Sequence, residues 1–470
     1  MKDKYESPFT ARYSSEEMTK LFSADTRYTT WRKLWLALAT AEKDLGLPIT
    51  EAHIEEMQAH LTDIDYEVVA AREKEVKHDV MAHLYAYGKA VPSAAGIMHL
   101  GATSCYVTDN ADLVIYREAL LLIKKQLLSA IKALWAFADK YKSLPTLGYT
   151  HYQPAQLVTV GKRATLWLQD LVTDLHDLEA LLADMKFLGC RGTTGTEASF
   201  MELYDGDERK VDAMNAKIAS AFGFKQCFDV CGQTYPRKTD SRIMKVLSGI
   251  AESAAKFATD IRLLQHDGEV MEGFGTKQVG SSAMPYKSNP MHAERICSLS
   301  RYLMADVMNG AMTASSQWLE RTLDDSANRR IAMCEGFLAA DAILLLLADL
   351  AAGLVVNEKV IEKRVKDYLP FIATENLLME GVKRGGNRQA LHEIIREASI
   401  RAKKAIAAGE TPDLLSDLWE SKAFGMSKEE MEKVLDPALY TGRAAAQTSA
   451  YLMKIKSIAD EGTAPAPINI

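Results

Sequence analysis

The sequence has little of what marks nucleic-acid-binding, disordered or disulfide-built proteins. Its 63 acidic residues outnumber its 56 basic ones, so the formal net charge is −7, and no long Lys/Arg run offsets this locally. A nucleic-acid polymer is therefore not an expected partner. The 27 glycines and 13 prolines are too few for a disordered or collagen-like chain. Six scattered cysteines in 470 residues do not suggest a disulfide framework, and they favour a cytoplasmic protein with reduced thiols.

Targeting and membrane signals are also scarce. The first ten residues, MKDKYESPFT, contain no apolar signal-peptide segment. The stretch 337–356 is apolar and long enough to cross a bilayer, but it contains Asp341 and Asp349. An Asp in mid-membrane costs roughly 2.5–3.5 kcal/mol on insertion scales. We therefore expect no membrane and predict that 337–356 is the central helix of a large soluble bundle.

Long helical patterns dominate the middle of the chain. Apolar residues recur every three or four positions over 113–137, 168–185 and 243–264, which keeps one apolar seam along each helix. Little of the chain shows the alternation of a strand. We predict an all-α fold, in which a long central helix bundle is flanked by smaller N- and C-terminal helical domains. At ~150 residues per domain the length suggests about three domains, with boundaries at 1–103, 104–356 and 357–470.

Breaks in the pattern predict where the long helices begin. We expect Thr108 or Asp109 as the N-cap of the first long helix. Pro154 is suited to the first turn of the second. Further interruptions fall at 189–199, 225–236 and 273–290.

The break at 273–290 carries several polar side chains. Residues 275–282 read G-x-x-x-x-G-S-S. The pattern lacks the lysine of a phosphate-binding P-loop and follows no predicted strand, so we reject the hypothesis of a nucleoside triphosphatase. What is left is a Gly-flanked loop with Ser281, Ser282, Lys287 and Asn289. It is either a polar linker or a functional loop, and its length inside a compact helical region favours function.

Histidines and cysteines give weak metal signals. His78 and His83 are five residues apart, about 140° around a helix, so they do not share a face. Cys227 and Cys231 lack a second Cys/His pair. His151 lies in the break between two long helices and is either a turn residue or a general acid or base.

The segment 320–330, ERTLDDSANRR, is unusually polar for a helical region. Arg321, Ser326 and Arg330 could converge on an anion, but the adjacent aspartates could equally pair these arginines on a solvated face. Arg12 and Tyr13 form a second anion-binding candidate. For each cluster taken alone, the solvated face is the simpler interpretation.

Taken together, these segments resemble the fumarase/aspartase superfamily. GSSAMPYKSNP (280–290) is similar to its long signature loop, G-S-S-x-M-P-x-K-x-N-P. Within the superfamily the chain most resembles the adenylosuccinate lyase family, from about residue 8 to the C-terminal helices. The other matching segments are 11–13, 77–83, 94–110, 150–163, 191–200, 232–235, 317–330 and 369–376.

The resemblance implies a β-elimination in purine nucleotide biosynthesis. Adenylosuccinate would give AMP and fumarate, and succinyl-aminoimidazole-carboxamide ribotide would give the carboxamide ribotide and fumarate. Such a reaction needs a base, an acid and donors for the carboxylate that takes up charge. The resemblance implies no cofactor and no metal. It also implies a homotetramer whose active sites, shared between subunits, bind a small-molecule nucleotide.

The resemblance also assigns roles to residues. Ser281 is the implied general base, His151 the general acid, and Lys287 stabilises the serine alkoxide. Thr103, Ser104 and Asn289 would hold the succinyl part, and His78 and Gln233 would lie near the cleaved bond. The other implied binding residues are Lys77 and Asp79, which flank His78, and those that hold the phosphate and other anionic groups: Arg12, Tyr13, Arg295, Arg321, Ser326 and Arg330.

The chain departs from the family pattern at two positions, and two alternative functions stay open. The chain most resembles the branch of this family that includes the animal enzymes, and Lys77 stands where these carry Arg. Ser288 replaces a basic residue of the loop pattern. Both departures bear on substrate affinity and loop kinetics. A sibling lyase for argininosuccinate, aspartate or malate is one alternative, which the segments 11–13 and 323–330 disfavour. A non-catalytic helical scaffold is the other, and the presence of both Ser281 and His151 argues against it.

Overall fold

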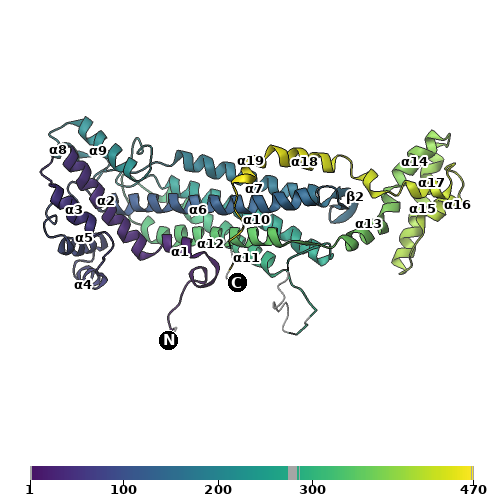
Figure 1. Ribbon diagram of the computed structural model, residues 1–470, viewed down its shortest axis with the longest axis horizontal. Coiled ribbons are helices and arrows are strands. Elements are labelled where there is room, and N and C mark those ends of the chain that lie inside the picture. Colours follow the sequence, from purple (N-terminus) through teal and green to yellow (C-terminus); the bar gives the residue numbers. More distant parts are fainter. Residues whose placement is uncertain (1–2, 274–282, 285, 467, 469–470) are drawn as a thin grey trace.

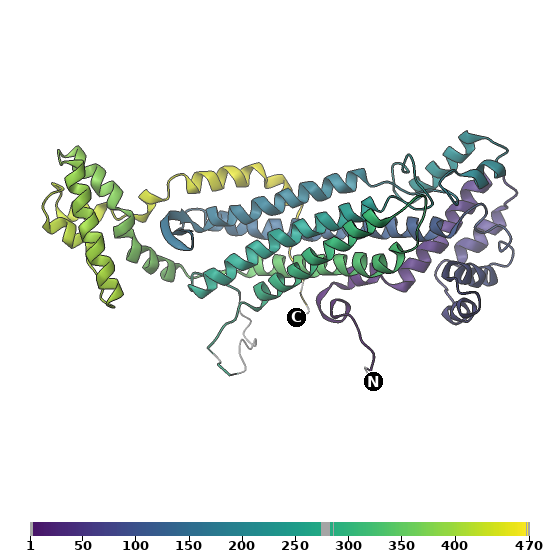
Figure 2. The same cartoon turned by 180° about the vertical axis from the view of Figure 1, so that it is seen from behind.

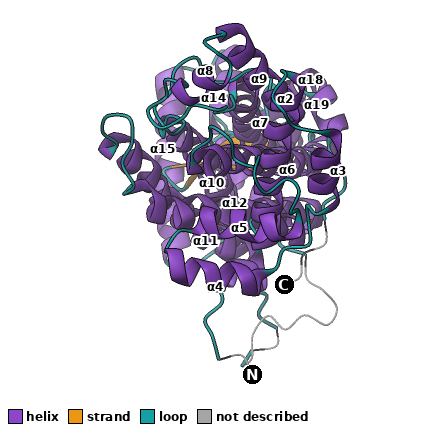
Figure 3. Ribbon diagram, turned by 90° about the vertical axis from the view of Figure 1, so that its left-hand side faces the viewer, coloured by secondary structure: helices purple, strands orange, loops and turns teal. Residues whose placement is uncertain are grey.

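Five long helices form the centre of the protein. The computed structural model describes residues 3–273, 283–284, 286–466 and 468. The helices run along the long axis of the molecule (Figure 1) and pack on one another through α10, which contacts α7, α11 and α12, and through α6, which contacts α7 and α12. Seen end-on, helices make up almost the whole cross-section (Figure 3), so the all-α prediction is confirmed. The five are α6 (Ser104–Lys140), α7 (Val160–Asp184), α10 (Lys238–His266), α11 (Met291–Ser316) and α12 (Asp325–Gly353).

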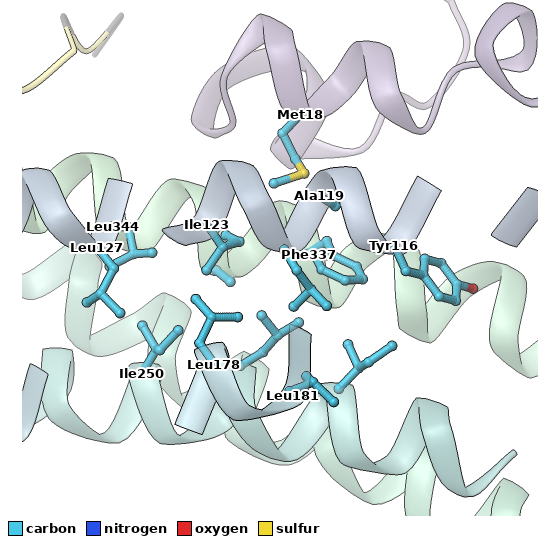
Figure 4. Close-up of a cluster of buried hydrophobic side chains, with 14 of the residues drawn as sticks. Met18, Tyr116, Ala119, Ile123, Leu127, Leu178, Leu181, Ile250, Phe337 and Leu344 are labelled. Atoms are coloured by element: carbon cyan, nitrogen blue, oxygen red, sulfur yellow. The ribbon is translucent and has the colours of Figure 1, made fainter. Parts of the chain in front are cut away.

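The predicted apolar seams meet inside this bundle. Figure 4 shows Ile123 and Leu127 of α6 beside Leu178 of α7, Ile250 of α10 and Leu344 of α12, and all five side chains are buried. Burying each such side chain contributes about 1.5–3 kcal/mol. Repetition of the seam along each helix therefore stabilises the side-by-side packing.

Helix α12 is the one helix of the described residues that is long and apolar enough to cross a membrane by composition, and 83% of its apolar window is buried in the protein. Asp341, at its middle, is 0% exposed. Its carboxylate accepts hydrogen bonds from the Ser15 backbone N–H (2.6 Å), the Ser15 hydroxyl (2.9 Å) and the Gln126 amide. Burial raises the pKa of Asp341, which these donors partly oppose. α12 therefore packs as a core helix, and its aspartate joins it to α6 and to the N-terminal segment.

Shorter helices cover the end of the bundle at the left of Figure 1. Ser15 and Ser23 cap α1 and α2, their hydroxyls accepting from the N–H groups of Met18 and Thr26, and α2 packs between α6 and α9. The elements at this end are α2 (Ala24–Asp44), α3 (Glu51–Ala59), α4 (Tyr66–Val76), α5 (Asp79–Ala90), α8 (Ala198–Leu203) and α9 (Glu208–Ala221). Before them, η1 (Phe9–Tyr13) and α1 (Glu16–Leu21) pack along α12.

The start of α6 differs from the prediction. The helix begins at Ser104 with Thr103 as its N-cap, so the prediction of Thr108 or Asp109 was wrong. Both lie inside the helix. Asp109 instead accepts a hydrogen bond from the Tyr235 N–H at 3.1 Å, a partner that no local pattern reveals.

A β-hairpin joins α6 to α7, where only a break was predicted. Strand β1 (Pro145–Thr150) pairs antiparallel with β2 (Gln153–Thr159). Pro154 lies in β2 opposite Tyr149, so its predicted place at a helix start was wrong. Thr159 caps α7 instead, its hydroxyl accepting from the Lys162 N–H at 3.1 Å. A second, two-residue pairing joins β3 (Val270–Met271) to β4 (Val355–Val356).

The C-terminal region has two parts. Residues of α14 to α17 enclose a hydrophobic core of their own, at the far end of the bundle from α5 (Figures 1 and 2). The chain then returns, and α18 and α19 pack on α7 and α6. The domain boundaries 1–103, 104–356 and 357–470 stay a proposal. The C-terminal elements are α13 (Glu358–Ile372), α14 (Thr374–Lys383), α15 (Arg388–Ala407), α16 (Leu414–Glu420), α17 (Lys428–Lys433), η2 (Pro437–Tyr440), α18 (Ala444–Lys454) and α19 (Lys456–Glu461).

Candidate active site

A cleft of about 670 Å³ lies where the N-terminal helices meet the bundle. This volume is typical of sites for small molecules. The walls come from the junction of α4 and α5, the first turns of α6 and α12, and the segments that precede α10 and α12. Nine predicted site residues line it: Lys77, His78, Asp79, Thr103, Ser104, Gln233, Arg321, Ser326 and Arg330.

One wall of the cleft is a chain of polar contacts around His78. This residue is the N-cap of α5, and its Nδ1 accepts the Met81 N–H at 3.5 Å. A ring nitrogen that accepts carries no proton, so in the neutral ring the proton is on Nε2, 3.4 Å from the Ser104 hydroxyl oxygen. Beside it, Arg330 Nη2 lies 3.0 Å from Asp79 Oδ2. The structure thus brings predicted residues of α5, α6 and α12 together.

The N-terminus of α6 opens into the same cleft. Thr103 is its N-cap, yet the Thr103 side chain accepts no hydrogen bond from the first turn. The helix is 37 residues long, and unpaired N–H groups at a helix N-terminus attract anions. Together with the hydroxyls of Thr103 and Ser104, these N–H groups suit a carboxylate.

Buried charges form the floor of the cleft. Arg237 Nη1 lies 2.8 Å from Asp109 Oδ2, and Arg237 Nε lies 2.6 Å from Asp325 Oδ2. Arg321 also contacts Asp325, at 3.0 Å. Burial acts to raise the pKa of Asp325, but the two guanidinium groups outweigh it and lower that pKa. Asp325 is therefore a fixed negative charge that holds Arg321 in place.

A second buried layer lies behind this floor. Arg329 Nε is 2.6 Å from Asp240 Oδ2, and its Nη2 is 3.0 Å from Asp112 Oδ2. The Tyr235 hydroxyl donates to Asp240 at 2.6 Å. Sequence reasoning missed these residues, although the polar run 320–330 pointed to their neighbourhood.

The charge of the cleft is nearly balanced within one chain. Six Arg and Lys residues and five Asp and Glu residues line it. Arg237 and Arg329 are already neutralised by buried aspartates. A substrate with a phosphate and two carboxylates would therefore need further cations to bind tightly.

Further cations lie on other parts of the chain. Arg12 and Tyr13 are in the η1 turn, and the Arg295 guanidinium of α11 lies 5.7 Å from the centroid of the Tyr13 ring. The Nη1 atom of Arg295 is buried and has no hydrogen-bond partner among the described residues. These three predicted residues form a second cluster that does not line the cleft.

The predicted acid lies at the other end of the bundle, where Figure 1 places β2 far from α5. His151 and Tyr152 are the two central residues of the hairpin turn, with φ of 52° and 57°. A two-residue turn with positive φ at both positions favours Asn-Gly, because most other residues that carry a Cβ are strained in this left-handed conformation. Placing His and Tyr there instead marks the turn as a functional candidate.

The predicted loop residues are only partly described. Lys287 is exposed, and its N–H donates to the Met284 carbonyl at 3.0 Å. Asn289 lies just before α11. Ser281 is outside the described residues. Among the described residues, no group of three or more His, Cys, Asp or Glu side chains is arranged to hold a metal ion, and the six cysteines are free.

Comparison with known families and proteins identifies relatives along nearly the whole chain. A family model described as "Lyase" matches residues 2–304, and one described as "Adenylosuccinate lyase C-terminus" matches residues 370–451. Proteins named adenylosuccinate lyase from Schizosaccharomyces pombe and Saccharomyces cerevisiae are each 48% identical over 96% of this chain, and the matches cover 94% and 95% of those proteins. One from Archaeoglobus fulgidus is 30% identical over 93% of this chain and 96% of its own.

Solved structures share the fold at lower identity. The 3-carboxy-cis,cis-muconate lactonizing enzyme of Pseudomonas putida superposes with a TM-score of 0.83 over 96% of this chain and 99% of its own, at 22% identity. A fumarate lyase from Mesorhizobium sp. BNC1 gives 0.79 over 94% and 98%, also at 22% identity. At this identity they support the bundle architecture alone.

Proposed function

The chain belongs to the adenylosuccinate lyase family, and from this we propose that it splits adenylosuccinate into AMP and fumarate. We extend the proposal to succinyl-aminoimidazole-carboxamide ribotide, which would give the carboxamide ribotide and fumarate. The observation that carries it is the gathering of nine predicted binding residues around one cleft. That cleft offers guanidinium groups, hydroxyls and a helix N-terminus to an anionic substrate.

The proposed reaction needs two proton transfers. Ser281, as an alkoxide, removes the proton from the carbon next to the C–N carbon, and Lys287 stabilises the alkoxide. The electron pair of that C–H bond forms the double bond of fumarate while the C–N bond breaks. His151 gives a proton to the departing nitrogen, a role suited to an imidazole at neutral pH.

The remaining residues would hold the substrate. Thr103, Ser104 and Asn289 bind succinyl carboxylates, and His78 and Gln233 lie near the bond that breaks. Arginine forks suit the phosphate. The anion-binding set is Arg12, Tyr13, Arg295, Arg321, Ser326 and Arg330, with Lys77 and Asp79 completing the α5 wall.

We also propose a homotetramer in which each site takes residues from several subunits. In one chain α5, whose first residues line the cleft, and β2, which follows the His151 turn, lie toward opposite ends of the bundle (Figure 1), so a complete site needs another copy. Large apolar side chains left exposed on α11, α12 and the segment between them suit subunit contacts: Met312 (62% exposed), Leu319 (86%), Leu323 (71%) and Ile331 (65%). We place the enzyme in the cytoplasm, where its free cysteines would stay reduced.

The direct test is fumarate release from adenylosuccinate by the purified protein with no added metal. Release from argininosuccinate alone would assign the chain to a sibling lyase, and no release from any of these substrates would favour the scaffold alternative. His151→Ala and Ser281→Ala should each lower kcat at least about 10²-fold. Replacing the exposed His392 of α15 by Ala is the matched control and should leave kcat unchanged.

Mixing the two inactive variants tests whether sites are shared. If Ser281 and His151 reach one site from different subunits, exchange creates some sites with both residues intact, and part of the activity returns. No return after verified subunit exchange would contradict shared sites.

A further inference from the structure

A buried cluster of charged and phenolic groups lies at the base of the β1–β2 hairpin, and the proposed mechanism does not use it. At its centre is Glu269, whose side chain is 1% exposed. It directly precedes β3 and lies about 120 positions along the chain from its hairpin partners, since its contact with Tyr149 spans 120 residues. Burying a carboxylate costs free energy unless partners compensate its lost hydration.

Four side chains from three other elements surround the Glu269 carboxylate. Oε1 accepts a hydrogen bond from the Tyr149 hydroxyl at 3.1 Å, and Oε2 accepts from the Thr146 hydroxyl at 3.3 Å. The Nε of Arg364 lies 2.8 Å from Oε1, and Nη1 of Arg163 lies 4.0 Å from Oε2. Two of these partners come from β1, one from α7 and one from α13. The carboxylate thus ties the hairpin to two helices.

The link from this cluster to His151 is short. Tyr149 lies two residues before His151, and its ring centroid is 6.1 Å from that of Tyr152. Tyr149 also follows the irregularity in β1, where the pairing register shifts between Leu147 and Tyr149. The turn itself holds His151 at φ 52° and Tyr152 at φ 57°. A strained turn keeps its shape only where surrounding contacts over-determine it.

Arg364 adds a second tie from the C-terminal region. Its Nη2 donates to the Tyr149 hydroxyl at 3.0 Å and lies 3.0 Å from Asp267 Oδ2. The Tyr149 hydroxyl therefore accepts from Arg364 while it donates to Glu269. The phenol is fixed between two opposite charges, which restrains the hairpin more than packing alone.

We propose that Glu269 is a positioning residue that, through Tyr149, holds His151 in the orientation needed to protonate the departing nitrogen. This rests on the proposed function, in which His151 is the general acid. In the proposed mechanism Glu269 itself contacts no substrate. A misplacement of an acid by about 1 Å can cost about a hundredfold in rate, so a group that fixes the turn affects kcat rather than binding.

The first test compares Glu269→Gln with a matched exposed control. Gln keeps the size but removes the charge that pairs with Arg364 and Arg163. Glu362→Gln on α13 removes only the pairs with Lys359 (2.7 Å) and Lys366 (2.9 Å) on the surface. For adenylosuccinate we expect kcat of Glu269→Gln to fall about ten- to a hundredfold with KM changed less than about threefold, and kcat of Glu362→Gln to stay unchanged. A kcat of Glu269→Gln equal to the wild type overturns the proposal.

A double-mutant cycle separates positioning from general stability. The variants are Glu269→Gln, His151→Gln and the two combined, each confirmed to have the same assembly and unfolding temperature range as the wild type. If Glu269 acts through His151, its loss has little further effect once His151 is gone. An equal loss in both backgrounds overturns the positioning role. A wild-type rate for His151→Gln alone removes the proposed acid, which is a distinct failure of the proposed function.

Tyr149→Phe repeats the test should Glu269→Gln fail to assemble. It deletes one hydroxyl from the contact between Glu269 and Arg364 and keeps the ring. We expect kcat to fall about three- to tenfold with KM unchanged, and no further fall in the His151→Gln background. A rate equal to the wild type, or the same loss in both backgrounds, overturns the proposal.

Discussion

Arg237 and Asp109 form an ion pair of 2.8 Å at the floor of the cleft, with side chains only 2% and 3% exposed. Asp109 also accepts the Tyr235 N–H at 3.1 Å, and Arg237 continues to Asp325 at 2.6 Å. The pair therefore connects α6, the start of α10 and the start of α12. It fixes Arg321 indirectly, because Asp325 is shared between Arg237 and Arg321.

Arg237→Met is expected to destabilise the protein strongly. The variant removes the guanidinium group that pairs with the buried carboxylates of Asp109 and Asp325. Removing one partner of a buried ion pair costs about 3–5 kcal/mol. Thermal unfolding measures the loss. Arg242→Met, in the first turns of the helix that Arg237 precedes, is the matched control. Its pair with Asp184 is 45% and 52% exposed, and such pairs contribute about 0–1 kcal/mol. Equal effects of the two variants would contradict the role assigned to the floor.

Glu42→Gln is expected to stabilise the protein at alkaline pH. Glu42 is 0% exposed, and neither carboxylate oxygen has a hydrogen-bond partner among the described residues. Burial raises its pKa from 4.5 to about 8. The folded state therefore keeps a proton that the unfolded state loses, so the stability present below pH 4.5 is lost as the pH rises toward 8.

The Gln variant removes this loss because an amide does not ionise. Its free energy of unfolding should match that of the wild type within about 1 kcal/mol at pH 4.5 and exceed it by about 3–5 kcal/mol at pH 9. Unfolding temperatures at the two pH values test this. Glu55→Gln, at an exposed position of α3, is the control and should change stability little at either pH. A constant difference between Glu42→Gln and the wild type across this range would contradict the burial argument.

The long helices were predicted well from the sequence, because the apolar spacing that identifies a helix involves only residues a few positions apart. Every apolar position of the 113–137 seam lies in α6, and the 243–264 seam lies in α10. The hairpin was missed because 145–159 contains Pro154 and Gly148 and no clear alternation. Its pairing depends instead on close approach of the two strands, and a Cβ at Gly148 would come within 2.6 Å of the Gln156 carbonyl oxygen.

The lining of the cleft was predictable only in part. Resemblance to a family identified the nine cleft residues, although they come from distant segments. The buried partners Asp109, Arg237 and Arg329 were not identified, because an ion pair over 128 positions has no local signature. Neither spacing nor composition indicated that one chain separates His151 from the cleft, since that depends on the straight, parallel course of the long helices.

Arg295→Gln is expected to weaken substrate binding without unfolding the protein. Arg295 Nη1 is buried without a partner among the described residues, and its guanidinium lies near the Tyr13 ring. A buried donor left unpaired costs free energy, so an anion that reaches Arg295 recovers that cost on binding. If the proposed function holds, the KM for adenylosuccinate rises about tenfold or more, while kcat changes less.

Without ligand, the Arg295→Gln variant should unfold at the same temperature as the wild type or higher, and AMP should raise that temperature less than it does in the wild type. The control is Arg301→Gln, six residues further along α11 and exposed, which should leave both KM and the AMP effect unchanged. An unchanged KM together with an undiminished AMP effect in Arg295→Gln would remove this arginine from the anion-binding set.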